Sequence, residues 1–338
     1  MKEQYINIIH IYNYAQLIAL LNSKDIKDIK GINLINDTIN DLSRYNILKL
    51  KKILLLKCNY NKLITAEHIS QFKNLKYLYC SLTNITEIPK ELIHLEKLIC
   101  QNTNISEIPN TLINLNHLNI STTLVQNIQK QLTKLEELDC SETSITMIPK
   151  ELIRLKKLNC RYTLINTIPN TLIKLTELYI TNTNVSKIPK ELVNLEILSL
   201  SYQRKIIKLP PELNKLKELI MIQSRIKNIP KEFINLKKLI IIGTQISEIP
   251  KELTNLELLN ITNTRISEIP KELINLKQLL CTNTYIINLP LTLEKLEYLC
   301  HDTITIDQYK NYKKLYIKIL IMYSKILNKD IRKLICNY

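Results

Sequence analysis

Residues 95–115 read LEKLICQNTNISEIPNTLINL, and this stretch contains a pattern that recurs along most of the chain. It opens with Leu95 and continues with Leu98 and Cys100 at alternate positions. A threonine and an Ile-Pro pair follow. The opening leucine returns every twenty residues, with a single interval of twenty-one, at Leu75, Leu95, Leu115, Leu135, Leu155, Leu175, Leu195, Leu216, Leu236, Leu256, Leu276 and Leu296. Such a period predicts stacked structural repeats instead of separate globular domains.

Each repeat contains signals for a strand and for a turn. Alternation places Leu98 and Cys100 on one side of a strand and Ile99 on the other. Pro109 fixes φ and can open a helical turn, and Leu112 then returns the chain to the core. We therefore predict one short strand, a turn, and one turn of α- or 3₁₀-helix in each repeat.

The pattern L-x-x-L-x-C/I-x-x-T resembles the signature of the leucine-rich repeat family, L-x-x-L-x-L-x-x-N/C-x-L. About thirteen repeats match, and the short repeats with an Ile-Pro pair resemble the compact bacterial and viral subclasses. Threonine stands where the family usually has asparagine, and its hydroxyl can also donate and accept hydrogen bonds. The composition is similar to that of leucine-rich repeat proteins from large DNA viruses of protists.

The resemblance implies an α/β solenoid, a horseshoe with a parallel β-sheet on its concave face and short helical or 3₁₀ turns on its convex face. A stack exposes apolar surface at both ends and needs caps. We expect an N-terminal helical cap in residues 1–28, the solenoid in residues 29–303, and a basic amphipathic helical cap in residues 304–338.

Six of the eight cysteines share one inward slot of the repeat, which isoleucine, leucine and methionine fill elsewhere. A slot that accepts these four residue types selects a compact apolar group, so we expect buried thiols. Structural zinc is the alternative, but zinc sites use C-x₂₋₄-C pairs, which the chain lacks. We expect no metal and no cofactor. The six residues are Cys58, Cys80, Cys100, Cys140, Cys160 and Cys281.

The sequence contains no motif typical of an enzyme. Only Gly31 and Gly243 are glycines, which excludes a glycine-rich phosphate loop, and the five histidines are scattered. Some proteins with compact repeats append a ubiquitin-ligase domain, but too few residues follow the repeats here to build one. We therefore expect a non-enzymatic protein.

The residues of each strand that point away from the core should line the concave face. Their mixture of aromatic and charged side chains suits protein recognition, and we expect a monomer that binds a protein partner. The alternative is that these are ordinary solvated strand residues. An apolar zone is also expected at Ile220, Ile240, Ile242 and Leu280. The candidate partner-binding residues are Tyr77, Tyr79, Glu137, Asp139, Glu142, Lys157, Arg161, Tyr162 and Tyr179. Charge reversal at Asp139 and Glu142 should weaken partner capture without changing stability.

The net charge of +16 is concentrated toward the C-terminus. In residues 306–338, eight Lys and Arg face two Asp. Helical spacing places four lysines on one face, either as the solvated side of a capping helix or as a contact for nucleic acid or an anionic membrane. These residues are Lys314, Lys318, Lys325 and Lys329.

The N-terminal stretch is interrupted by polar residues and lacks a small-residue cleavage site, so we expect no secretory signal. The chain should then lie in the cytoplasm, which would be the host cytoplasm for a viral protein. The cysteines should be reduced there.

Overall fold

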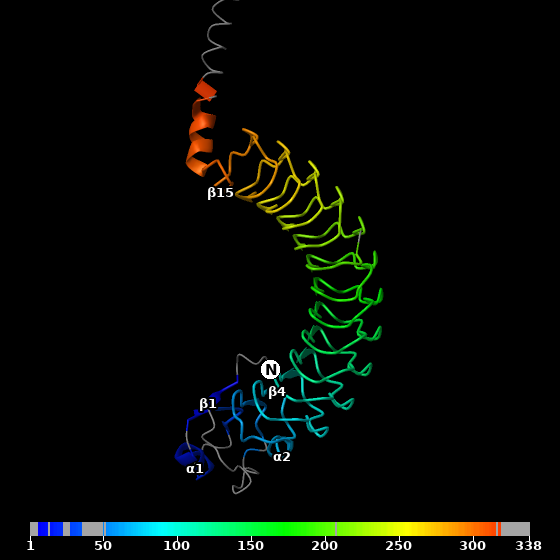
Figure 1. The fold of residues 1–338 in the computed structure, drawn as a ribbon. Coiled ribbons are helices and arrows are strands. Elements are labelled where there is room, and N and C mark those ends of the chain that lie inside the picture. The colour runs from blue at the N-terminus through cyan, green and yellow to red at the C-terminus, as the bar shows by residue number, and fades with distance from the viewer. Residues whose placement is uncertain are drawn as a thin grey trace, which may run out of the picture. The chain divides into compact units, whose positions relative to one another are not determined.

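The computed structural model describes residues 6–12, 14–22, 28–35, 50, 52–206, 208–315 and 317–318. The chain divides into two compact units, residues 1–216 and 217–338, and each is described by itself. Within each unit every repeat contributes a short strand, and neighbouring strands run parallel in chain order (Figure 1).

Most strands are only three residues long. The first unit contains two helices, α1 (Tyr14–Asn22) and α2 (Ala66–Ser70). Its strands are β1 (Ile8–Ile11), β2 (Gly31–Leu34), β3 (Leu55–Lys57), β4 (Tyr77–Tyr79), β5 (Lys97–Ile99), β6 (His117–Asn119), β7 (Glu137–Asp139), β8 (Lys157–Asn159), β9 (Glu177–Tyr179) and β10 (Ile197–Ser199). The strands of the second unit are β11 (Glu218–Ile220), β12 (Lys238–Ile240), β13 (Leu258–Asn260), β14 (Gln278–Leu280) and β15 (Tyr298–Cys300).

The core consists of columns of equivalent residues. Leu98 pairs with Leu78 and Leu118 across the sheet, so the same slot of each repeat stacks on itself. In the quoted stretch, Leu98, Cys100 and Leu112 are all 0% exposed. The alternation read from the sequence is therefore confirmed, because it places these side chains on the buried side of every strand.

A left-handed residue and a threonine follow the strand in most repeats. Asn102 has φ of 56°, and its N–H donates to the carbonyl of Ser121 in the next repeat at 3.0 Å. The hydroxyl of Thr103 donates to the carbonyl of Cys100 at 2.7 Å. Positive φ recurs at Tyr60, Leu82, Thr122, Glu142, Tyr162, Asn182, Tyr202, Gln223, Gly243, Asn263 and Asn283. The sequence did not predict this conformation, because residues as different as Leu, Thr, Glu and Tyr occupy the slot.

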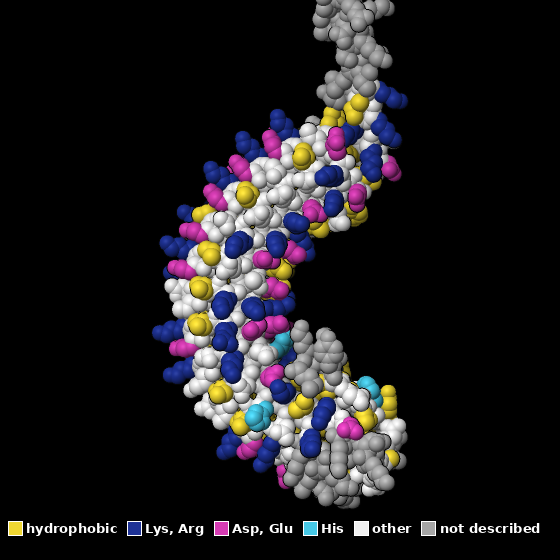
Figure 2. Space-filling model, turned by 180° about the vertical axis from the view of Figure 1, so that it is seen from behind, with side chains coloured by type: hydrophobic (Ala, Val, Ile, Leu, Met, Phe, Trp, Pro, Cys, Tyr) yellow, Lys and Arg dark blue, Asp and Glu magenta, His cyan; other side chains and the backbone are white. Residues whose placement is uncertain are grey.

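The opposite side of each repeat is made of tight turns. Leu112 N–H donates to Pro109 at 3.3 Å, and Leu115 N–H donates to Leu112 at 3.1 Å. Both bonds span three residues, which is the 3₁₀ spacing. Rows of charged and hydrophobic side chains recur from repeat to repeat on the surface that Figure 2 shows.

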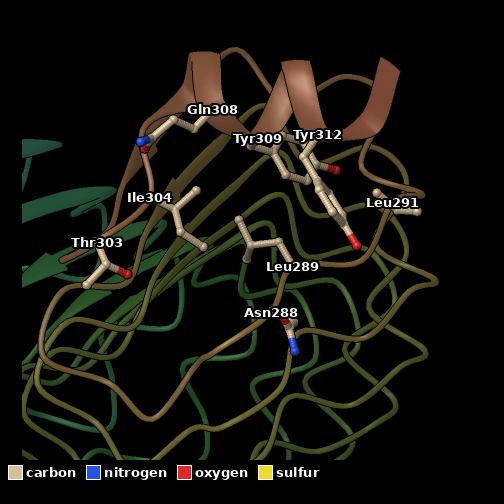
Figure 3. Close-up of a pocket in the computed structure, with 8 residues that line it drawn as sticks. All are labelled: Asn288, Leu289, Leu291, Thr303, Ile304, Gln308, Tyr309 and Tyr312. Atoms are coloured by element: carbon tan, nitrogen blue, oxygen red, sulfur yellow. The ribbon is translucent and has the colours of Figure 1, made fainter. Parts of the chain in front are cut away.

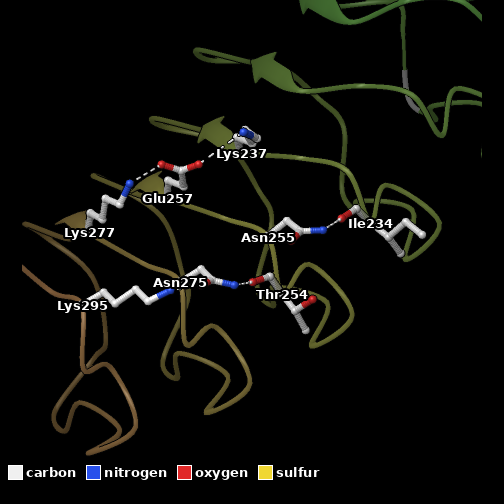
Figure 4. Close-up of polar contacts among 8 residues, drawn as sticks. All are labelled: Ile234, Lys237, Thr254, Asn255, Glu257, Asn275, Lys277 and Lys295. Carbon is white, nitrogen blue, oxygen red and sulfur yellow. Dashed lines mark hydrogen bonds and ion pairs between the residues drawn. The ribbon is translucent and has the colours of Figure 1, made fainter.

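Polar side chains connect successive turns (Figure 4). Asn255 Nδ2 donates to the carbonyl of Ile234 at 2.8 Å, and Asn275 Nδ2 donates to that of Thr254 at 2.9 Å. Lys295 in turn donates to Asn275 at 2.6 Å. The two asparagine bonds satisfy backbone carbonyl groups of the preceding turn, and the lysine bond holds the Asn275 side chain.

The sheet begins earlier than we expected. Residues 1–28 were predicted to form only a helical cap, but β1 lies there and pairs with β2 through Ile8 and Gly31. Its sequence, IIHI, is rich in β-branched residues, which favour strands. Helix α1 follows and buries Leu17 and Leu21.

At the other end, residues 306–315 and 317–318 are helical. Tyr309 is 5% exposed, and its hydroxyl donates to the carbonyl of Pro290 at 2.8 Å. The rest of the predicted C-terminal cap lies outside the described residues. In the part of the chain that the structure describes, no helix has the length and apolar character needed to cross a bilayer.

The repeat of twenty-one residues takes up its extra residue after β10. Gln203 occupies the threonine slot, is fully buried, and donates through Nε2 to Ile180 O and to Thr183 Oγ1. Arg204 and Lys205 are exposed beside it. The strand is therefore unchanged, and the irregularity is confined to the turn.

All six cysteines of the inward slot are buried. Burial raises the pKa of the Cys80 thiol to about 12 from its ordinary value of 9.0. The predicted role as compact core residues is confirmed for this column.

We predict that glycine is preferred in the left-handed slot. Thr122 is β-branched and has φ of 54°, so Thr122→Gly should raise the free energy of unfolding by about 1 kcal/mol. Gly243→Ala should lower it by about 1 kcal/mol, because its φ is 63°. Urea unfolding measures both changes. Gln126→Gly, at a neighbouring position without positive φ, is the control and should lower the free energy of unfolding. If Gln126→Gly stabilised the protein as much as Thr122→Gly does, the explanation would be contradicted.

We also predict a loss of stability at alkaline pH. Between pH 9 and pH 12 the Cys80 thiol is ionised in the unfolded chain but stays protonated in the folded one. Stability therefore falls as pH rises, by about 1.4 kcal/mol per pH unit for each such thiol. In urea unfolding from pH 9 to 11, Cys80→Ala should lose stability less steeply than the wild type. Ile120→Val, in the same slot without a thiol, should keep the wild-type slope.

Candidate functional site

The first and third residues of each strand point away from the core and form a surface that we call the sheet face. On β7, β8 and β9, it carries Glu137, Lys157, Arg161, Glu177 and Tyr179, which we call the central patch. Arg161 lies two residues beyond the end of β8. Register places Lys157 between Glu137 and Glu177 on the adjoining strands.

A lysine, a carboxylate and a phenol meet within the central patch. Lys157 Nζ lies 2.8 Å from Glu177 Oε2. The Tyr179 hydroxyl donates to the same oxygen at 2.9 Å. These contacts fix the direction of the Tyr179 ring, and the three side chains therefore form a preassembled group.

The Tyr179 ring also carries two cations. Arg161 Cζ lies 4.5 Å from the ring centroid, and Lys157 Nζ lies 5.8 Å from it. Both distances are within the range of cation–π attraction. Arg161 Nε is buried and has no hydrogen-bond partner among the described residues. Stacking on the Tyr179 ring is thus the contact that positions the guanidinium among the described residues.

The charges of this group support one another. Burial raises the pKa of Glu177, but the hydrogen bonds from Lys157 and Tyr179 outweigh it, and the net pKa lies below its ordinary value. The hydrogen bond to Glu177 raises the pKa of Lys157. Burial, together with the bond to Glu177, raises the pKa of Tyr179. All three groups therefore keep their usual ionisation states at neutral pH.

The predicted acidic residues differ in how much they can offer a partner. Glu137 faces His117 at 2.9 Å. Asp139 accepts bonds from Ser141 N at 3.0 Å and Ser141 Oγ at 2.6 Å, and from Asn159 Nδ2 at 2.9 Å. Both carboxylate oxygens hold the local backbone or the next strand, which argues against the expectation that charge reversal at Asp139 leaves stability unchanged.

Glu142 and Tyr162 occupy the left-handed slot of neighbouring repeats. Both have φ of 56°, and Tyr162 is 51% exposed. They lie beyond the strands, so they border the sheet face and do not belong to its central columns.

Tyr77 does not belong to an exposed site. It is 7% exposed and packs in a cluster with Ile6 and Leu55. The N-terminal segment covers it, a contact between residues far apart in the sequence. A Cβ at Gly31 would lie 2.9 Å from Ile6 Cγ2, so glycine permits this close approach.

Tyr79 is half-buried and lies under two lysines. Lys57 Nζ is 4.9 Å and Lys97 Nζ is 5.5 Å from its ring centroid. Strands β5 and β6 separate it from the central patch. The candidate residues therefore form two groups and not one.

Glu177 pairs with Lys157, and His117 pairs with Glu137, although neither Glu177 nor His117 was among the candidate residues. The signal that identifies them is the constant period, because Glu177 stands twenty residues after Lys157, and His117 twenty before Glu137.

Of the predicted basic face, Lys314 and Lys318 lie on the C-terminal helix and are exposed. Lys325 and Lys329 lie outside the described residues, so the contact with nucleic acid or membranes stays a prediction.

A cavity of about 580 Å³ lies beneath this helix (Figure 3). Leu289, Ile304, Tyr309 and Tyr312 point into it from the helix and the last repeat. Its lining combines these apolar side chains with the polar side chains of Asn288, Thr303 and Gln308. The described residues contain no cluster of three or more His, Cys, Asp or Glu that could hold a metal ion.

We predict that Asp139 is a stabilising residue. Asp139→Ala removes three hydrogen bonds and should lower the free energy of unfolding by about 2 kcal/mol. Asp139→Asn should cost less, because Asn119 makes equivalent bonds to Ser121 in the preceding repeat. Urea unfolding of both variants measures the difference, and equal stability of Asp139→Ala and the wild type would contradict this role.

Comparisons with solved structures agree with this architecture. A leucine-rich repeat protein of Leptospira interrogans is 26% identical, with 87% of this chain and 88% of that chain covered, at a TM-score of 0.74. An internalin of Listeria monocytogenes is 22% identical, with 82% and 81% covered, at a TM-score of 0.63. The plant peptide hormone receptor RGFR1, in complex with RGF2, is 21% identical, with 81% and 60% covered, at a TM-score of 0.52.

No protein-family model and no curated protein sequence matches the chain. The resemblance to viral proteins stays a prediction. The predicted fold class is confirmed by the strand arrangement and by the similar structures: the chain has the fold of leucine-rich repeat proteins.

Proposed function

We propose that the chain binds a protein partner through the central patch of the sheet face. The observation that carries the proposal is the group of Lys157, Glu177 and Tyr179 with Arg161 stacked on the ring. Tyrosine and arginine are enriched among the residues that dominate the energy of protein interfaces.

The arrangement reduces the cost of binding. Ordering a flexible side chain at an interface costs about 0.5–1.5 kcal/mol, and here internal contacts already hold the side chains in place. Arg161 is partly exposed, and stacking on Tyr179 already holds its guanidinium in place, so it can add hydrogen bonds to a partner's acceptors. The plant receptor in complex with RGF2 supports the compatibility of this fold with a polypeptide ligand.

The test begins with affinity capture from the native cell and identification of the captured protein. The purified partner is then titrated against wild type and against a double variant, Lys157→Gln with Arg161→Gln. We expect at least a tenfold rise in Kd, because these residues provide the cationic and stacking contacts. Lys187→Gln, an exposed lysine outside the sheet face, is the matched control and should bind as the wild type does.

The outcome separates this proposal from the electrostatic alternative. If the double variant keeps wild-type affinity, the central patch is not the binding surface. If affinity falls only in Lys314→Gln with Lys318→Gln and also falls steeply with salt, the basic C-terminal helix carries the interaction instead.

A further inference from the structure

A second surface with different chemistry lies on the sheet face of the second unit. Ile220 of β11 pairs with Ile240 of β12, and Ile222 and Ile242 lie two residues further along each chain segment. Adjacent strands are about 4.8 Å apart, so the four side chains are close neighbours. All four are partly exposed. We call them the isoleucine patch.

The fold does not require apolar residues in these slots. The neighbouring slots that face the core, Leu219, Met221, Leu239 and Ile241, are 0% exposed and already supply the buried surface. The isoleucine patch lies on the other side of the strands.

In some other repeats the same two slots hold polar residues that bond to each other. Asn119 Oδ1 accepts from Ser121 N at 3.0 Å and from Ser121 Oγ at 2.8 Å. Within the second unit itself, Asn260 Oδ1 accepts from Thr262 N at 3.1 Å. Isoleucine gives up these bonds and leaves apolar surface in water. Exposed apolar patches of this kind mark interaction sites.

The first unit contains a covered pair of apolar residues on its sheet face. Leu55 and Tyr77 occupy such slots, and Ile6 covers them, leaving them 0% and 7% exposed. The isoleucine patch, by contrast, stays accessible.

Lysines border the isoleucine patch where the strands begin. Glu257 lies between Lys277 Nζ at 2.6 Å and Lys237 Nζ at 3.5 Å (Figure 4). Lys238 Nζ lies 3.3 Å from Glu218. All three lysines are at least 36% exposed, so a partner can reach them. Lys237 and Lys277 share Glu257, so a carboxylate of a partner could pair with Lys237.

From this combination we propose that the isoleucine patch binds a polypeptide segment of a partner that carries aliphatic side chains next to Asp or Glu. The aliphatic side chains cover the four isoleucines, and the acidic ones pair with Lys237 and Lys277. This inference concerns a different surface from the central patch, and it stands without the function proposed there.

The test uses a phage-displayed library of random peptides. The library is depleted on a polar variant, Ile220→Asn, Ile222→Ser, Ile240→Asn and Ile242→Ser, and is then selected on the wild type. The variant copies the residues of Asn119 and Ser121, which the fold accommodates. Ile242→Thr, which copies Thr262, is a second and milder variant.

We expect the enriched peptides to combine Leu, Ile or Val with Asp or Glu. As synthetic peptides they should bind the polar variant at least tenfold more weakly than the wild type, and Ile242→Thr with an intermediate loss. Lys237→Gln with Lys277→Gln should also weaken them. Circular dichroism and urea unfolding establish that the variants are folded.

Three results would overturn the proposal. One is enrichment of basic peptides, or of none that distinguish wild type from the polar variant. Another is unchanged peptide binding by the lysine variant, because the acidic side chains of the peptide would then not pair with Lys237 and Lys277. The third is a wild-type dimer in light scattering that the polar variant abolishes, because a second copy of the chain would then cover the isoleucine patch.

Discussion

Hydrogen bonding between neighbouring repeats is the constraint on which this structure depends. A strand of three residues has no partner within its own repeat, so its backbone groups must pair with the strands before and after it. Cys100 N–H, for example, donates to Asn119 O of the next repeat at 2.9 Å. This pairing fixes the register, and the register in turn stacks each buried residue on its equivalent. The same relation arranges the sheet face in columns, so that a side chain there meets the residues twenty positions away.

The period explains which parts of the molecule could be predicted from the sequence. Strand positions, the buried column of thiols and aliphatic residues, and the rows on the sheet face all follow from alternation and spacing. Tyr77 could not be placed, because its cover, Ile6, comes from outside the repeats. The left-handed slot was also missed, since Leu82, Thr122 and Tyr162 carry no sign of that conformation. In the same way, Asp139 has the composition of a binding residue, but its hydrogen bonds are those of a structural one.

The candidate surfaces show how one scaffold can present different chemistry without a change of backbone. The third strand position holds Asn119, whose amide supports the local turn, but it holds Tyr179 in one repeat and Ile240 in another. Only contacts reveal which of these is structural and which is available. Sequence alone places all three in one column and cannot rank them, because each residue type is compatible with a partly exposed strand position.

The repeat of twenty-one residues bears on how such a chain tolerates changes of length. Its extra residue lies in the turn near Gln203, and β10 keeps its register with β9. A single-residue insertion inside a strand would instead invert every following side chain, from core to solvent, until the turn. Gain or loss of one complete repeat would preserve all the columns. Duplication and deletion of whole repeats are therefore the changes of length that this architecture accepts most easily. Homologues should differ in length by complete repeats.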